Sequence, residues 1–219
     1  MRTPSIFKKK QGISLIELLV ALTIFGISIG AVYRLFIVQS KAYTVQDQAV
    51  EVQQNVRSAM EVLLRDLRMT GYDDDSAASN FTVSPAIANF SGSNITVQYE
   101  YYNAAANRYE LHAVSYSLAG GTNLIRSWTV TPALGAQFKY PDETILENVD
   151  ALTFSYGVDT DGSGAVNKWV SPAGIGTSKI IGIRATLTAR PDQTNIDVKQ
   201  RISPRTLTSA VILRNLIIK

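Results

Sequence analysis

The hydrophobic pattern changes twice along the chain, and its three parts predict an apolar helix, an amphipathic continuation of that helix, and a set of strands. The run from Ile13 to Tyr33 holds a single charged residue, Glu17, and is long enough to cross a bilayer as one helix. From Val38 to Leu67 apolar residues recur at steps of three and four, which predicts one apolar stripe on a continuing α-helix. From Asn94 onward apolar and polar residues alternate, as in half-buried β-strands. The pattern therefore predicts an α+β chain.

The predicted helix runs without interruption because no proline stands between Ile13 and Met69, and Gly71 is a natural stop. Heptad-like spacing in its second half is also compatible with a coiled coil, but the later strands supply a sheet for the stripe to pack on. Gly26 and Gly30 form a G-x-x-x-G step, which indicates either close helix approach or a local soft point. The stripe consists of Val38, Ala42, Val45, Ala49, Val52, Val56, Ala59, Leu63 and Leu67.

Strands are expected where the alternation is clearest, and their short spacing implies antiparallel pairing. A polar segment from Tyr72 to Asn94, rich in Asp, Ser, Ala and Asn, is predicted to be a loop between helix and sheet. Residues 206–213 are predicted to form a last strand or a docked tail. The other predicted strands are 95–102, 109–115, 124–130, 152–158 and 181–190.

The start of the chain carries the clearest motif. Lys8, Lys9 and Lys10 precede Gly12, and the apolar run then contains one acid, Glu17, in a segment where a charge is costly without a partner. The alternative is an ordinary signal anchor with an isolated acid, and no A-x-A-like cleavage site follows the apolar run. A signal anchor leaves unexplained why the glycine, the basic leader and the acid occur together.

This segment resembles the class III signal of type IV pilins and type II secretion pseudopilins. The resemblance implies that a prepilin peptidase cuts between Gly12 and Ile13 and that Ile13 is then N-methylated. It also implies that Glu17, the fifth mature residue, meets the N-terminal amine of a neighbouring subunit during assembly. The family usually has Phe then Thr after the glycine, where this chain has Ile13 and Ser14.

The expected organisation follows from the signal and the pattern. Because Lys and Arg flanking a membrane helix stay cytoplasmic, we expect a single pass through the inner membrane with the C-terminal domain in the periplasm. The expected fold is pilin-like, a long N-terminal helix packed on an antiparallel β-sheet domain. The parts are a cleaved leader (1–12), a transmembrane or filament-core helix (13–38), an amphipathic half packed on the sheet (39–71) and a β-rich head (72–219).

The C-terminal half resembles PilW-type minor pilins, and GspJ-type pseudopilins are similar in organisation. The resemblance rests on Asn148–Asp159 followed by Thr160-Asp161-Gly162, and on the ending Val211–Asn215. It implies a minor pilin that primes or caps a type IV pilus and resides near its tip. A minor pseudopilin of a type II secretion system and a tip adhesin or DNA-uptake component are the alternatives. The implied partners are other minor and major pilins, prepilin peptidase, the inner-membrane assembly platform and, before assembly, membrane lipid.

Charge and composition limit the other classes of function. The formal charge of +3 includes four basic residues of the leader, so the mature chain has 17 basic and 18 acidic side chains, a charge of −1. Nucleic-acid binding is therefore not expected. The chain has no cysteine, which rules out disulfides and thiolate sites. His112 is the only histidine and no catalytic motif accompanies it, so we do not expect an enzyme.

One loop suggests a metal. Asp159, Asp161 and Ser163 alternate as oxygen ligands do in the first half of a calcium loop, with Gly164 at the sharp turn. The bidentate glutamate of a complete EF-hand is missing, because Val170 stands there. The same residues also form ordinary polar turns. The sequence thus predicts either a calcium site or a hairpin turn, and no other cofactor.

Overall fold

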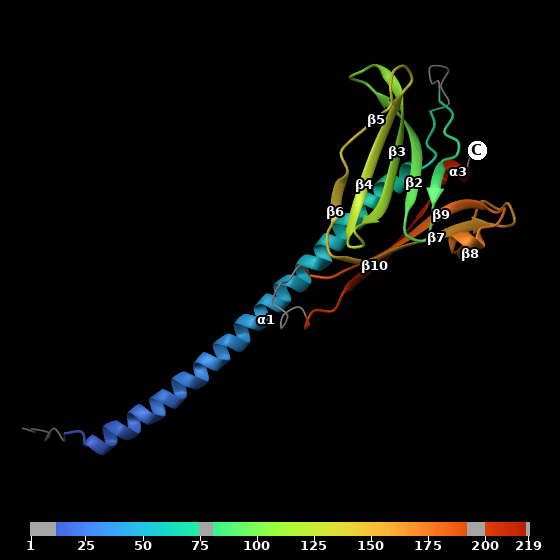
Figure 1. Cartoon of the computed structure of the whole chain (residues 1–219). Helices are drawn as coiled ribbons and strands as arrows, with labels where there is room; N and C mark the ends of the chain where they lie inside the picture. Colours follow the sequence, from blue (N-terminus) through green and yellow to red (C-terminus); the bar gives the residue numbers. More distant parts are fainter. Residues whose placement is uncertain (1–11, 75–80, 192–199, 218–219) are drawn as a thin grey trace, which may run out of the picture. The chain divides into compact units, whose positions relative to one another are not determined.

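The computed structural model describes residues 12–74, 81–191 and 200–217. The chain divides into two compact units, Met1–Gln46 and Asp47–Lys219, which are described separately. One helix, α1 (Leu15–Met69), belongs to both, so its first part forms the described N-terminal unit and its last part enters the head (Figure 1). Most of the predicted leader, residues 1–11, lies outside the described residues.

The head contains two antiparallel sheets (Figure 1). The first has the order β1-β2-β3-β4-β5, and β6 also pairs with β4; the second has the order β10-β9-β7-β8. A 3-10 turn, η1 (Pro172–Gly174), and a short helix, α3 (Arg214–Ile217), complete the described elements. The strands are β1 (Ile87–Phe90), β2 (Ile95–Asn103), β3 (Arg108–Ala119), β4 (Asn123–Pro132), β5 (Phe138–Lys139), β6 (Glu143–Leu146), β7 (Val149–Asp159), β8 (Lys168–Val170), β9 (Lys179–Ala189) and β10 (Arg205–Ile212).

The predicted α+β architecture is confirmed, including the long helix and every long strand. Residues 206–213 form a strand for most of their length, rather than a docked tail. The prediction of a loop over 72–94 was wrong in one place, because β1 lies inside it and pairs with β2. With four residues and a bulge between Ile87 and Asn89, this strand is too short and irregular to produce a readable alternation.

The head has one core, in which α1 contacts both sheets. The predicted stripe is buried from Val52 to Leu67, whereas Val38 and Ala42 are exposed. Leu63 belongs to the same cluster as Tyr116 of the first sheet and Phe154 of the second. The stripe thus packs against strands of its own chain from Val52 onward, as an amphipathic helix does when its apolar face has a partner.

A buried acid fixes α1 against the first sheet. Asp66 is only 4% exposed, and its Oδ2 accepts hydrogen bonds from the Tyr116 hydroxyl (2.6 Å) and from Arg126 Nε (2.7 Å). Burial, followed by the nearby charge of Asp66, raises the pKa of Tyr116, so this hydroxyl stays a donor. Two side chains of adjacent strands therefore hold one residue of the helix.

The end of α1 is held by the C-terminal segment. Gly71 has a φ of +72°, and a Cβ there would lie 2.6 Å from the Leu216 side chain, so glycine is required at this helix stop. The side-chain amide of Asn215 donates to the backbone carbonyl of Thr70 (3.2 Å), and Leu213 is fully buried. The predicted stop is confirmed, and residues 213–216 secure it.

Candidate functional site

The predicted cleavage site lies just outside the regular helix. The first backbone hydrogen bond of α1 joins the Leu18 amide to the carbonyl of Ser14 (3.1 Å), so the Gly12–Ile13 bond precedes the hydrogen-bonded turns. Ile13 is 76% exposed, and apart from its chain neighbours no described residue lies within 4 Å of a Cβ built on Gly12. A peptidase needs an accessible peptide bond, and the exposed Ile13, ahead of the first hydrogen-bonded turn, meets that need on its side of the bond.

Glu17 lies in the first turn of α1 and differs from the other polar residues of the apolar segment. The hydroxyls of Thr23 and Ser28 donate to carbonyls of the preceding turn, at Leu19 (2.7 Å) and Ile24 (2.8 Å). Within the described part of the chain, the Glu17 carboxylate makes neither a hydrogen bond nor an ion pair. A positive partner for Glu17 would thus have to come from another segment or another molecule.

The apolar residues around Glu17 are exposed along the whole first part of α1. By length and composition α1 can cross a membrane, and its most apolar stretch is unburied. Phe25 and Phe36 are examples, at 62% and 69% exposed. Gly26 and Gly30 have no neighbour within 4 Å of a built Cβ, so this face is open to a second helix. Such a surface requires lipid or other apolar helices around it.

The predicted calcium loop forms a closed polar turn after β7. Asp159 accepts the amides of Asp161 (3.2 Å) and Gly162 (2.8 Å) on Oδ1, and that of Gly164 (2.8 Å) on Oδ2. Asp161 accepts the Ser163 amide (3.0 Å) and the Asn167 side chain (3.1 Å). Hydrogen bonds from Ser163 hold the pKa of Asp161 at about 2. The described residues contain no group of three acidic or histidine side chains placed to hold a metal.

We expect this loop to be stable without a cation, because its carboxylates already accept the amides that would otherwise be unsatisfied. The unfolding temperature of the protein should then be the same in calcium and in EDTA. A calcium site instead predicts a rise in unfolding temperature with calcium concentration, by mass action. Asp161→Asn is the discriminating variant, since a rise that this substitution abolishes would establish the calcium site.

His112, the only histidine, lies inside the head rather than in a cleft. It is 5% exposed, and its Nε2 is 3.5 Å from Oε2 of Glu110. Its ring contacts those of Tyr99, Tyr101 and Trp128 at centroid distances of 5.1–5.3 Å. Burial lowers the pKa of His112, while the hydrogen bond and charge of Glu110 oppose that shift. The surroundings are those of a packed core histidine.

The lowered pKa of His112 predicts that the head loses stability on acidification. An imidazole that resists protonation in the fold but is protonated in the unfolded chain stabilises the fold above its ordinary pKa of 6.5. This contribution is lost as the pH falls below that value. Urea midpoints at pH 7.5 and 5.5 should show the loss in the natural protein and a smaller loss in His112→Gln. An equal loss in both would contradict this role of His112.

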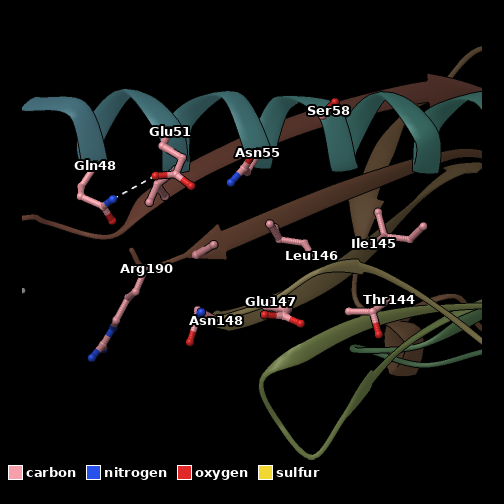
Figure 2. Close-up of a pocket in the computed structure, with 12 residues that line it drawn as sticks. Gln48, Glu51, Asn55, Ser58, Thr144, Ile145, Leu146, Glu147, Asn148 and Arg190 are labelled. Atoms are coloured by element: carbon pink, nitrogen blue, oxygen red, sulfur yellow. Dashed lines mark hydrogen bonds between the residues drawn. The ribbon is translucent and has the colours of Figure 1, made fainter. Parts of the chain in front are cut away.

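A polar cleft of about 520 Å³ opens between α1 and the corner where β6 meets β7 (Figure 2). Gln48 and Glu51 lie on the helix side, joined by a hydrogen bond of 3.0 Å, and Glu147 and Asn148 lie on the sheet side. Arg190 borders the cleft but pairs with Asp150 at 2.6 Å. The cleft thus presents carboxylate, amide and hydroxyl groups to whatever lies against it.

Residues 7–33 match the family model of the prokaryotic N-terminal methylation motif. The match spans Gly12, Ile13 and Glu17, the residues predicted for cleavage, methylation and assembly. A comparison with curated proteins gives no match. The chain therefore carries a type IV pilin-like prepilin signal, joined to an α+β architecture of the pilin kind.

Proposed function

We propose that the protein is a minor pilin that primes or caps the assembly of a type IV pilus. The observation that carries the proposal is the exposed apolar first part of α1, within a prepilin signal, with Glu17 as the one charged residue between Ile13 and Tyr33. A prepilin-type motif implies processing by prepilin peptidase and assembly with other pilins. The protein acts by being assembled and catalyses no reaction.

The assembly step follows from the energetics of the apolar helix. In the inner membrane, lipid covers the apolar side chains while Glu17 has no neutralising group from the described chain. Removal of the leader at Gly12 would create a new positive N-terminus on each subunit. An amine brought beside the carboxylate of a neighbour relieves the cost of both charges, and so fixes the axial register of the two helices.

The proposal also covers how the subunit is oriented in the membrane and where it lies in the filament. The basic leader favours a cytoplasmic N-terminus, which puts the head in the periplasm before assembly. The PilW-like sequence of residues 148–162 supports a minor rather than a major subunit, and hence a place near the tip. Association with the assembly platform would precede insertion into the filament.

Deletion of the gene in its natural host tests the proposal against the pseudopilin alternative. A minor pilin predicts that surface filaments fall by at least tenfold, while secreted proteins leave the cell normally. A minor pseudopilin predicts retained filaments and a periplasmic build-up of secreted proteins. Complementation with the full-length chain is the control, and loss of secretion alone would overturn the pilus assignment.

A further inference from the structure

Strand β10 has one edge that no described strand covers. It is the outermost strand of the second sheet, and it pairs only with β9. All eight residues are in register, from Arg205 opposite Ala189 to Ile212 opposite Gly182, with no bulge. An open strand edge is a template for another strand, and proteins usually protect it.

The other outermost described strands are short or irregular, whereas β10 is neither. β5 and β8 have only two and three residues. β1 and β6 have four residues each, and their pairing is interrupted by register shifts. β10 contains no proline and no lysine, and its one charge, Arg205, stands at the first position. Proline, lysine, a bulge and a short length, which are common devices against strand addition, are therefore all absent from the described strand itself.

The register identifies which backbone groups face the open side. The Leu213 amide donates to the carbonyl of Ile181 (2.8 Å), directly opposite in the continuing register, so this is a hydrogen-bonded pair. Hydrogen-bonded and non-bonded pairs alternate in antiparallel sheets. The amides and carbonyls that point away from β9 are therefore those of Thr206, Thr208, Ala210 and Ile212.

A groove and two cations lie beside the same edge. The groove, of about 260 Å³, is lined by Gln53, Val56 and Arg57 of α1 and by the first three residues of β10. Arg57 and Arg205 are exposed, and among the described residues neither has an acidic partner. A chain lying along β10 would meet backbone hydrogen-bonding groups, an apolar floor at Val56 and Leu207, and two positive charges.

We propose that β10 and this groove bind an extended acidic segment of a different subunit of the filament, which adds a fifth strand to the sheet. The inference rests on the proposed function for the class of partner, but the surface is argued from the head alone. Main-chain hydrogen bonds supply affinity in such strand addition, and side-chain pockets supply specificity. The arginine pair selects an acidic segment.

Proline at position 208 tests the backbone part of the proposal. Thr208→Pro removes one outward amide and places a ring on the open side, while proline is tolerated at sheet edges. Thr208→Ala is the matched control, because both variants lose the hydroxyl pair with Thr186 (2.9 Å) but only one loses the amide. Urea unfolding of the full chain in detergent establishes that both variants are folded.

The readout is the amount of other subunits bearing the methylation motif that are recovered with the full-length chain from detergent extracts of its natural host. Recovery should fall about tenfold or more with Thr208→Pro and stay within about twofold with Thr208→Ala. Arg57→Glu combined with Arg205→Glu should also lower recovery. Lys168→Glu, at the opposite edge of the same sheet, should not.

A photo-crosslinker on Thr208→Cys identifies the occupant, since the natural chain has no cysteine to compete for the label. Crosslinking to an acidic segment of a different subunit is the expected result. Crosslinking to a second copy of this chain would overturn the strand-addition proposal but not the proposed function. Undiminished recovery with a folded Thr208→Pro would do the same. If the unsubstituted chain keeps its leader and no other subunit bearing the methylation motif is recovered with it, the proposed function is overturned instead.

Discussion

Glu17→Ala should abolish most filament formation while leaving the protein in the membrane. The substitution removes the one charge of an otherwise apolar segment, so insertion becomes easier. Assembly loses the carboxylate that would neutralise a neighbour's N-terminal amine. A charge at the membrane centre costs about 2.5–3.5 kcal/mol and one near a helix end costs less, so leaving the neighbour's amine unpaired corresponds to a loss in association of about tenfold or more.

Filament number by electron microscopy and membrane fractionation measure the two effects of this variant separately. Thr23→Ala is a suitable control, because its hydroxyl is satisfied within the helix by the carbonyl of Leu19. That variant should assemble nearly normally. Normal filament number in the Glu17→Ala strain would remove the proposed role of the carboxylate, whatever the control shows.

Asp66→Ala should cause a large loss of stability in the head. It leaves the half-buried Arg126 without its 2.7 Å partner and the Tyr116 hydroxyl without an acceptor. Removing one member of a buried ion pair costs about 3–5 kcal/mol, because the remaining charge stays desolvated. Part of the Arg126 side chain reaches solvent, and Glu143 lies 3.7 Å away, so we expect the lower end of that range.

Tryptophan fluorescence during urea unfolding measures this loss, since both tryptophans, Trp128 and Trp169, lie in the head. Asp47→Ala, at an exposed position of α1, should change the free energy of unfolding by less than about 0.5 kcal/mol. Combining Asp66→Leu with Arg126→Met should recover much of the loss, because an apolar pair needs no compensation. A loss below about 1 kcal/mol in Asp66→Ala would show that the ion pair does not fix the helix.

Long periodic segments made much of the fold predictable. The helix and strands such as β2, β7 and β9 have enough residues for steps of three and four, or of two, to be recognised. β5, with two residues, shows no period at all, and its pairing depends on β4 being already in place. Tertiary context therefore decides the short strands, which sequence patterns cannot show.

The candidate sites divide in the same way. Gly12 and Glu17 could be recognised because the motif is local and its residues lie within a few positions of one another. The contact between Asp66 and Arg126 joins residues 60 positions apart. One signal was available, since Asp66 stands three residues after Leu63 on the stripe, where a polar residue is unexpected. The open edge of β10 could not be inferred from sequence, because it depends on strand order.

The intact mass of the protein recovered from cells with and without active prepilin peptidase tests the central claim most directly. We predict a chain that has lost residues 1–12 and gained one methyl group on Ile13 when the peptidase is active. Without the peptidase, the full chain should remain. A full-length, unmethylated chain in peptidase-positive cells would contradict the claim, and the assembly role of Glu17 would fail with it.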